Sequence, residues 1–214
     1  MNEIRGITQA IARISSLLEE NKGKRVLIGI VGAPGAGKSH LSGELHKQLP
    51  TTNPTLKFSV VPMDGYHLSN QELENLQRRD RKGAPDTFDS HGFASLVQRI
   101  STDTTNKIYY PIFHREIEES IAAEGVVEPE TQLVIIEGNY LLLETDGWKE
   151  IKNHLTQTWF IDVPQELRHE RLINRHIKFG KSPDDARDWS LGSDERNADI
   201  IRASASRADS IFTF

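Results

Sequence analysis

Short, continuous apolar runs recur along the chain and alternate with segments of helical periodicity. Four of these runs are rich in branched residues and occupy residues 25–32, 57–64, 132–138 and 158–163. Runs of this kind are typical of strands that are buried on both faces of a parallel sheet. The apolar stretch at residues 210–214 predicts a fifth strand.

Helical patterns fill the intervals between these strands. Apolar residues recur at helical spacing over residues 4–18, with Asn2 as the expected N-cap and Gly23 as the expected stop. A second helix is predicted at residues 38–49, and a third follows Asp89, which is a suitable cap. Strands that alternate with helices form βαβ units, so we expect an α/β fold with a parallel sheet covered on both faces.

Residues 165–187 differ from the rest of the chain in their positive charge. They predict an arginine-rich helix, a break at Gly180 and Pro183, and a second helical piece. A basic pair of helices beside a nucleotide site is typical of a lid that closes over the reactants. We expect this lid to extend over residues 165–190.

Composition narrows the class of protein. The 214 residues (24.2 kDa) are expected to form one domain, residues 1–214, because a domain averages about 150 residues. The 26 basic and 31 acidic residues give a formal charge of −5, which argues against general nucleic-acid binding. The lack of cysteine excludes disulfide scaffolds, thiolate zinc sites and cysteine nucleophiles, and it favours a cytoplasmic location. No apolar run approaches the roughly 20 residues that span a bilayer, and the N-terminus lacks the features of a secretory signal, so no membrane association is expected.

The clearest motif lies between the first predicted strand and the helix after it. It fits the pattern GxxxxGK[ST] and consists of Gly32, Ala33, Pro34, Gly35, Ala36, Gly37, Lys38 and Ser39. Its glycines let backbone N–H groups turn toward phosphates, and the helix N-terminus adds partial positive charge. Lys38 is predicted to reach the β- and γ-phosphates of a nucleotide, and the Ser39 hydroxyl to ligate Mg²⁺. The alternative is a glycine-rich turn that binds no ligand.

Three classes of P-loop protein can be compared with the remaining motifs. A GTPase should carry an NKxD motif, but residues 106–109 read NKIY and lack the aspartate. An ABC-type ATPase needs a signature far from the P-loop, whereas the LSGE at residues 41–44 follows it directly. A small-molecule kinase needs an acceptor base, an acceptor pocket and a cationic lid, and the chain has a candidate for each.

Acidic residues end several of the predicted strands. Ligands of parallel sheets bind at the carboxyl ends of the strands, so Asp64 falls beside the P-loop if the two strands are neighbours. There it could accept the proton of an attacking hydroxyl; the alternative is a turn residue before Gly65. Glu137 ends the third strand and is placed for a metal or water contact, with an exposed strand end as the alternative. Asp162 is better explained as a helix cap, because Pro164 follows it closely.

Three arginines of the predicted lid lie three and four residues apart. This spacing puts Arg168, Arg171 and Arg175 on one face of a helix. We expect them to stabilise the charge on a transferring phosphoryl group. The alternative is a solvated helix with ordinary ion pairs to Glu166 and Glu170.

Taken together, these segments resemble a known family. The P-loop, VPMDGYH, YYPIFHR, EGNYLL and the arginine-rich segment occur in the same order in uridine kinases, phosphoribulokinases and bacterial-type pantothenate kinases. The combination of MDGYHLSN, RKGAPDTFD and EGNYLL is similar to the nucleoside-kinase-like or "fructose transport system kinase" branch. The resemblance covers residues 25–214. It implies a P-loop NTPase three-layer sandwich with a central, mostly parallel sheet and an arginine-rich helical lid, and it implies ATP and Mg²⁺ as cofactors.

The resemblance also implies roles for individual residues. Asp64 corresponds to the general base near Mg²⁺, Glu137 lies near the metal and the acceptor, and the three lid arginines contact phosphates, with Arg171 among the catalytic residues. His40, directly after Ser39, is grouped with the nucleotide-binding residues because of its position, and packing on the helix is the alternative. Contacts to the acceptor are implied for Tyr110, His114 and Arg115, together with Asp64 and Glu137. Tyr66 and His67 are further candidates for acceptor contacts, and for His67 the alternative is a hydrogen-bonding group on a surface loop.

Two positions depart from the family pattern. Relatives often carry Pro-x-Phe-Asp-Arg where this chain has a histidine, His114. Uridine kinases tend to carry an acid for the ribose hydroxyls at the place of Gly83, whereas the loop here is more similar to the KGFPESYD loop of pantothenate kinases. The acceptor therefore stays open among a nucleoside such as uridine, a pantothenate-like compound and a sugar.

We predict an ATP-dependent phosphotransferase that moves the γ-phosphoryl group of ATP to a hydroxyl of a small molecule. The main alternative is a regulatory nucleotide-binding P-loop ATPase that has no small-molecule acceptor and signals through a partner. A polynucleotide kinase is a third interpretation, which the acidic net charge disfavours. Dimers are common in the family, so a homodimer is a candidate assembly, and the sequence leaves the oligomeric state open.

Overall fold

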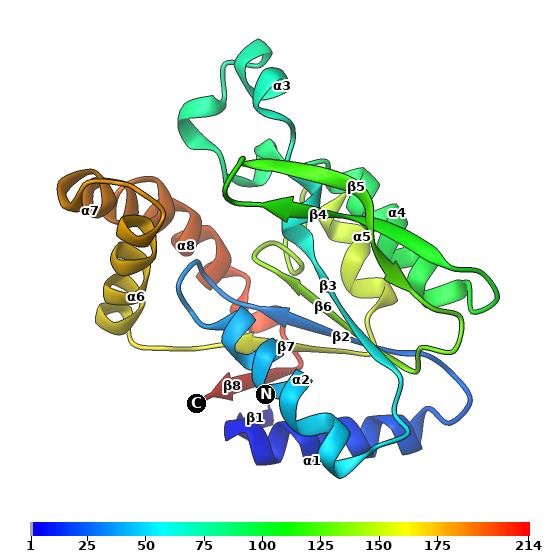
Figure 1. Cartoon of the computed structure of the whole chain (residues 1–214). Helices are drawn as coiled ribbons and strands as arrows, with labels where there is room; N and C mark the ends of the chain where they lie inside the picture. The colour runs from blue at the N-terminus through cyan, green and yellow to red at the C-terminus, as the bar shows by residue number, and fades with distance from the viewer. Residues whose placement is uncertain (1) are drawn as a thin grey trace.

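A six-stranded parallel sheet forms the centre of the computed structural model, which describes residues 2–214 (Figure 1). The strand order is β1-β8-β7-β2-β6-β3, and every neighbouring pair is parallel. The strands are β1 (Asn2–Arg5), β2 (Val26–Val31), β3 (Phe58–Pro62), β6 (Leu133–Gly138), β7 (Gln157–Ile161) and β8 (Ser210–Thr213). All five predicted strands are present, and the predicted parallel sheet is confirmed.

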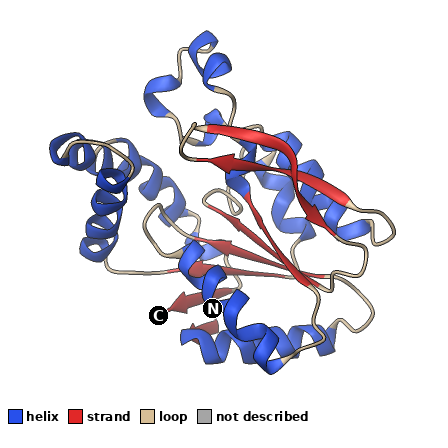
Figure 2. Ribbon diagram, viewed as in Figure 1, coloured by secondary structure: helices blue, strands red, loops and turns tan. Residues whose placement is uncertain are grey.

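Helices cover both faces of this sheet (Figure 2). They are α1 (Gly6–Glu20), α2 (Lys38–Thr52), α3 (Asn70–Asn75), α4 (Ser90–Thr102), α5 (Trp148–Ile151), α6 (Gln165–Lys178), α7 (Pro183–Leu191) and α8 (Ser193–Ala203). Alternation along β2 explains the two layers, because successive side chains of a strand point to opposite faces. Ile28 and Ile30 belong to the core that contains the buried residues of α1 and α2. Leu27 and Val31 belong to the core beneath α4 and α5. The predicted three-layer sandwich is therefore confirmed.

An antiparallel hairpin lies beside the main sheet and was not predicted. Strands β4 (Ile108–His114) and β5 (Glu119–Val127) form it, with a register shift between Tyr110 and Ile112. Pro111 accounts for this irregularity, since proline has no N–H to donate to the ladder. The hairpin packs on the 3₁₀ turn Met63–Tyr66, where a Cβ on Gly65 would lie 2.0 Å from the Pro111 carbonyl oxygen.

The predicted lid is a pair of helices that stands at one side of the sheet, next to α8 (Figure 1). α6 ends at Lys178, Gly180 has a φ of +95°, and Ser182 caps α7 by accepting a hydrogen bond from the amide of Asp185. The predicted break between the two helices is confirmed. Asp89 likewise caps α4, as expected, through the amide of Gly92.

Two local predictions are wrong. Residues 4–18 do not form one helix that begins after Asn2, because Asn2–Arg5 is a strand in which Ile4 pairs with Phe212. The apolar side chain of Ile4 is buried in the strand as it would be on the inner face of a helix, and α1 begins only at Gly6. Asp162 does not cap a helix, since Pro164 is the N-cap residue of α6 and no side chain satisfies the cap.

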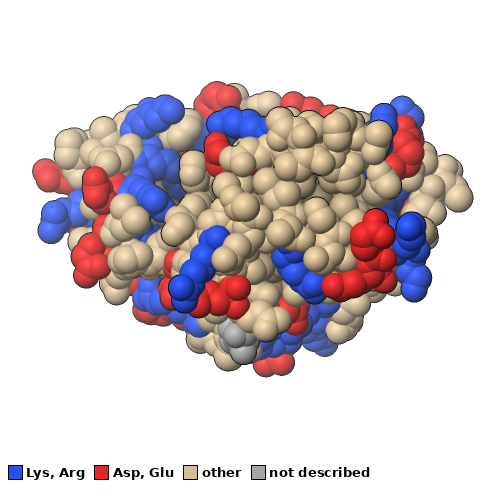
Figure 3. Space-filling model, turned by 90° about the horizontal axis from the view of Figure 1, so that it is seen from below, with Lys and Arg blue, Asp and Glu red and all other residues tan. Residues whose placement is uncertain are grey.

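Charged side chains of both signs lie around the rim of the molecular face in Figure 3, and other residues occupy its centre. This face shows no continuous basic surface of the kind that follows a nucleic-acid backbone. Over residues 2–214 the structure contains no helix that combines the length and apolarity needed to cross a bilayer.

Candidate active site

The P-loop connects the end of β2 to the start of α2. Two of its glycines, Gly35 and Gly37, have φ values of +82° and +102°, a conformation that other residues rarely adopt. A Cβ on Gly35 would also lie 2.7 Å from the carbonyl oxygen of Arg168, and one on Gly37 would lie 2.8 Å from the Phe214 ring. Both positions therefore require glycine for backbone geometry and for space.

Lys38 lies at the first turn of α2 and points back over the loop. Its ammonium group donates hydrogen bonds to the carbonyl oxygens of Gly32 (2.8 Å) and Ala33 (3.3 Å). Burial lowers the pKa of Lys38 to about 8, although the nearby carboxylates of Glu137 and Asp64 favour the charged form. A desolvated cation held only by neutral carbonyls is a strong ligand for an anion such as a phosphate.

Glu137 joins the P-loop helix to the carboxyl end of the sheet. Its two carboxylate oxygens accept hydrogen bonds from the hydroxyls of Ser39 (2.6 Å) and Ser42 (3.0 Å). In the sheet, Glu137 pairs in register with Ile30 of β2 on one side and Pro62 of β3 on the other. The condition that the strands of the P-loop and of Asp64 are neighbours is therefore not met, because β6 lies between them.

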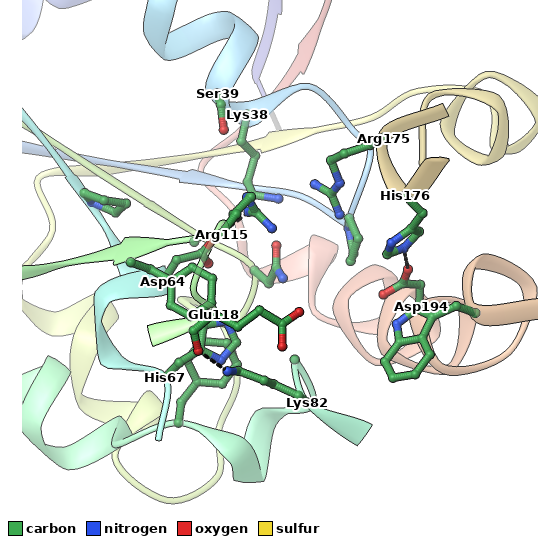
Figure 4. A pocket seen from close by; sticks show the side chains of 18 of the residues that line it. Lys38, Ser39, Asp64, His67, Lys82, Arg115, Glu118, Arg175, His176 and Asp194 are labelled. Carbon is green, nitrogen blue, oxygen red and sulfur yellow. Dashed lines mark hydrogen bonds and ion pairs between the residues drawn. The ribbon is translucent and has the colours of Figure 1, made fainter. Parts of the chain in front are cut away.

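Asp64 nevertheless faces the same space as the P-loop. It lies in the 3₁₀ turn Met63–Tyr66 directly after β3, and its Oδ2 accepts a hydrogen bond from Arg115 at 2.9 Å. Arg115 follows β4, so the hairpin brings this guanidinium to the carboxylate. Both side chains are partly exposed toward the cavity (Figure 4).

A cavity of about 410 Å³ separates the P-loop from the hairpin and the lid helices. Eight of the predicted site residues line it: Pro34, Lys38, Ser39, Asp64, His67, Arg115, Glu137 and Arg175. Figure 4 shows Lys38 and Ser39 at one end of this cavity and His67 with Lys82 at the other. The structure thus brings a phosphate-binding loop, carboxylates and lid residues to one space.

Other predicted acceptor residues do not line the cavity. The Tyr110 hydroxyl donates to the Val60 carbonyl oxygen at 3.0 Å, and this side chain is buried. Tyr66 packs on Phe93 with ring centroids 5.2 Å apart. His114 pairs with Glu124 at 2.6 Å on the hairpin, which raises the pKa of His114. These contacts position the walls of the site.

The three lid arginines occupy different environments. Arg168 is buried, pairs with Glu195, and donates to the Pro34 carbonyl oxygen at 3.3 Å, so it supports the P-loop from behind. Arg171 is exposed and lies over the Phe214 ring, 5.7 Å from its centroid. His40 lies against the same ring at 5.5 Å. Arg175 lines the cavity, and burial lowers its pKa.

Sequence reasoning missed several residues of the cavity wall. These are Arg79, Lys82, Phe88, Phe113, Glu118, His176, Lys181, Trp189 and Asp194. Lys82 and Phe113 lie within RKGAPDTFD and YYPIFHR, two segments that carry the family resemblance, and this position is the signal that could have identified them. Trp189 lines the cavity beneath Lys181, whose ammonium group lies 4.3 Å from the centroid of the indole ring. The hydrogen bond between His176 and Asp194 (2.7 Å) joins residues of α6 and α8, which are distant in sequence, so no local pattern indicates it.

His67 contributes an uncharged aromatic ring to the wall of the cavity, although its side chain can be protonated. Its ring stacks on Phe88, with centroids 3.9 Å apart, and lies 4.7 Å from Phe113. Burial lowers the pKa of His67 to about 4, so the ring is neutral near pH 7. Its buried Nδ1 has no hydrogen-bond partner in the structure.

Comparisons with known proteins agree with this geometry. A model of the "Phosphoribulokinase / Uridine kinase family" matches residues 27–214. The Schizosaccharomyces pombe protein named "Putative uridine kinase C227.14" is 33% identical over 161 residues, which cover 73% of this chain and 68% of that protein. The uncharacterized protein YggC of Escherichia coli is 30% identical over 199 residues, 92% of this chain and 81% of that protein.

A solved structure extends the similarity to the whole fold. The "putative fructose transport system kinase from Silicibacter sp. TM1040" is 35% identical, superposes with a TM-score of 0.87, and covers 98% of each chain. The family match, the P-loop geometry and this fold agree with one another. The chain belongs to the phosphoribulokinase/uridine kinase family of ATP-dependent P-loop kinases.

Proposed function

We propose that this protein transfers the γ-phosphoryl group of ATP, in the presence of Mg²⁺, to a hydroxyl group of a small metabolite. The observation that carries the proposal is the shared cavity, in which Lys38 and Ser39 of the P-loop face the same space as the Asp64 carboxylate. A protein that only binds or hydrolyses nucleotide needs the P-loop, but it does not need a walled acceptor space beside it.

The phosphate end of the cavity suits a nucleoside triphosphate. Lys38 can exchange the carbonyl oxygens of Gly32 and Ala33 for phosphate oxygens, which form stronger, charge-assisted hydrogen bonds. Arg175 lines the same cavity and pairs with no carboxylate within residues 2–214. We assign to Arg175 the role of stabilising the negative charge that spreads over the oxygens of the transferring phosphoryl group.

The donor set fits Mg²⁺. Ser39, Glu137 and Asp64 offer hydroxyl and carboxylate oxygens, which are the ligands that this hard cation prefers. Within residues 2–214 no group of three or more His, Cys, Asp or Glu residues forms a complete metal cage. Mg²⁺ is usually held by one or two carboxylates together with substrate phosphates and waters. When bound, Mg²⁺ neutralises charge on the phosphate oxygens.

Asp64 is assigned to the acceptor hydroxyl. Its carboxylate accepts the hydroxyl proton as the oxygen attacks the γ-phosphorus, and the bond from that phosphorus to the β–γ bridging oxygen breaks. Arg115 holds the carboxylate in place through its 2.9 Å hydrogen bond. Closure of the lid helices would exclude water, which otherwise competes with the acceptor.

An ADP-release assay tests the proposal. Mg-ATP is supplied with nucleosides, pantothenate or simple sugars, and parallel wells contain no acceptor. ADP release that depends on one class of acceptor is the expected result. Slow release that is equal in every well, and that Asp64→Asn leaves unchanged, would instead favour the regulatory ATPase.

A further inference from the structure

Lys82 occupies the end of the cavity that lies away from the P-loop (Figure 4). Its ammonium group donates hydrogen bonds to Asn70 Oδ1 and to the Glu118 backbone carbonyl oxygen, both at 2.6 Å. The same group lies over the Phe113 ring, 5.1 Å from its centroid. All three partners are neutral, and Lys82 forms no ion pair with any carboxylate among residues 2–214.

The acidic side chains around Lys82 are engaged elsewhere or exposed. The Glu118 carboxylate pairs with Arg79 at 2.6 Å. Glu119 Oε1 accepts a hydrogen bond from the Asn70 backbone amide at 3.0 Å. Asp80 is exposed and also lines a second hollow formed by the lid helices. Lys82 is thus a half-buried cation without a counter-ion. Removing its charge from water costs free energy, which a bound anion would offset.

The backbone that carries Lys82 is held firmly. The Gly83 carbonyl oxygen accepts a 2.5 Å hydrogen bond from the buried Tyr140 hydroxyl, and the Gly83 amide donates to Thr87 Oγ1 at 3.0 Å. Gly83 itself has a φ of +105° and presents no side chain to the cavity. This wall therefore offers a fixed ammonium group and no carboxylate for sugar hydroxyls at position 83.

The nearby walls add apolar surface. Phe88, Phe113 and the neutral ring of His67 line the same cavity as Lys82 and Asp64, and the Phe113 ring lies beside both His67 and Lys82. A ligand that spans this space meets the Asp64 carboxylate, aromatic rings and the Lys82 ammonium group, and the Glu118 carboxylate in the same wall is already paired with Arg79. An ammonium has three N–H donors, and protein atoms use two of those of Lys82.

We infer that Lys82 binds an anionic oxygen group, a carboxylate or a phosphate, on an acceptor whose reactive hydroxyl lies at Asp64. The inference rests on the proposed phosphoryl transfer and names its substrate class, a hydroxy acid or a hydroxyalkyl phosphate. A neutral nucleoside leaves Lys82 without a counter-ion and is expected to be a poor acceptor. Lys82 is therefore the residue that determines specificity for the acceptor.

Matched neutral and anionic compounds test this inference. The probes are glycerol, glycerate and glycerol 3-phosphate; pantothenol and pantothenate; and ribose and ribose 5-phosphate. Binding is measured by calorimetry with Mg²⁺ and a non-hydrolysable ATP analogue, and ADP release is measured separately with Mg-ATP. At least one anionic compound should bind, and be phosphorylated, roughly 10- to 100-fold better than its neutral partner. The carboxylate and phosphate members show which anion the site prefers.

Variants of Lys82 test whether this residue causes the preference for anionic over neutral compounds. Lys82→Met should lower the affinity for the anionic compound by roughly 10- to 100-fold, mainly through KM, and leave the neutral partner unaffected. Lys82→Arg should restore part of the loss. Lys149→Met, on the exposed surface of α5 and outside the cavity, is the matched control and should behave like the wild type.

The two readouts separate this inference from the proposed function. Equal use of neutral and anionic partners, or an anion preference that survives Lys82→Met, overturns the inference while acceptor-dependent ADP release upholds the kinase. Anion binding that depends on Lys82, without acceptor-dependent ADP release, upholds the site and overturns phosphoryl transfer. Failure of every anionic probe to bind at millimolar concentration also overturns the inference.

Discussion

Arg115 donates a hydrogen bond to the Asp64 carboxylate at 2.9 Å, although the two residues lie 51 positions apart in the chain. Asp64 lies in the turn after β3, a partly buried edge strand of the main sheet, and Arg115 follows the first strand of the separate hairpin. The hydrogen bond orients one carboxylate oxygen toward Arg115 and leaves the other for the cavity. This relationship makes the role of Asp64 testable without disturbing its surroundings.

Asp64→Asn should leave ATP binding near normal and lower phosphoryl transfer by at least roughly 10²-fold. The amide oxygen of asparagine can still accept the Arg115 hydrogen bond, but the amide cannot take a proton from the acceptor. The measurement is single-turnover phosphoryl transfer beside nucleotide affinity. Asp146→Asn, at an exposed loop position outside the cavity, is the control. Unchanged turnover in Asp64→Asn would refute the assignment of a general base.

Ser39→Ala should raise the Mg²⁺ concentration needed for half-maximal activity by roughly 10-fold, because one of the proposed oxygen ligands is lost. Ser42→Ala provides the matched comparison, since Ser42 also donates to the Glu137 carboxylate but does not line the cavity. A Mg²⁺ titration of both variants is the measurement. Equal shifts in the two would mean that Ser39 acts only by holding Glu137.

The lid arginines should separate into a structural and a functional class. Arg168→Met should lower the free energy of unfolding by roughly 2–4 kcal/mol, because it leaves the partly buried Glu195 with fewer partners and removes the contact to Pro34. Arg175→Met should leave stability near the wild-type value, since it removes a desolvated cation that has no carboxylate partner in the described chain, and should lower kcat. Chemical denaturation and steady-state kinetics of both variants test this division. A loss of stability in Arg175→Met without a kinetic effect would contradict it.

Lys38 should make the stability of the nucleotide-free protein depend on pH. Its pKa is about 8 in the folded protein because of burial, and the ordinary value is 10.5, so between these values the unfolded chain binds more protons. Stability from this group therefore rises as pH goes from 8 to 10.5, by about 1–3 kcal/mol in total. Lys38→Met removes the titrating group. The difference in unfolding free energy between wild type and variant should rise over that window and stay constant below pH 7; a flat difference throughout would show that Lys38 is not desolvated.

The main sheet was largely predictable because its central strands β2, β6 and β7 are buried almost throughout, on both faces. Runs such as residues 133–136 are then continuously apolar, and this pattern can be recognised from the sequence alone. The hairpin was missed for the opposite reason. Most of β5 is exposed or half-exposed, and Pro111 interrupts β4, so neither strand shows a sustained apolar run. Ile4 shows a further limit, since one apolar side chain fits a helix face and an edge strand equally well.

The candidate site divides in the same way. Lys38, Ser39, Asp64 and Glu137 were found because each lies in a local motif or at a strand end, where parallel sheets place their ligands. The spacing of Arg168, Arg171 and Arg175 indicated a common helix face, but their burial differs because α8 and the P-loop contact only part of that face. Tyr110 lay in a recognisable segment, yet its hydroxyl points to the Val60 carbonyl oxygen.

The amino-acid sequence alone therefore determined the features that depend on neighbouring residues. These are the P-loop, the acidic residues at strand ends and the helical break before Pro183. Tertiary structure alone decided which charges are satisfied. Whether a cation such as Lys82 or Arg168 meets a carboxylate depends on segments that are distant in sequence and close in space. Arg168 forms an ion pair with Glu195 and has a structural role. Lys82, in contrast, donates hydrogen bonds only to neutral oxygen atoms and lies over an aromatic ring. Desolvation and pairing are properties of the folded surroundings, and they determine which side chains remain available to a ligand.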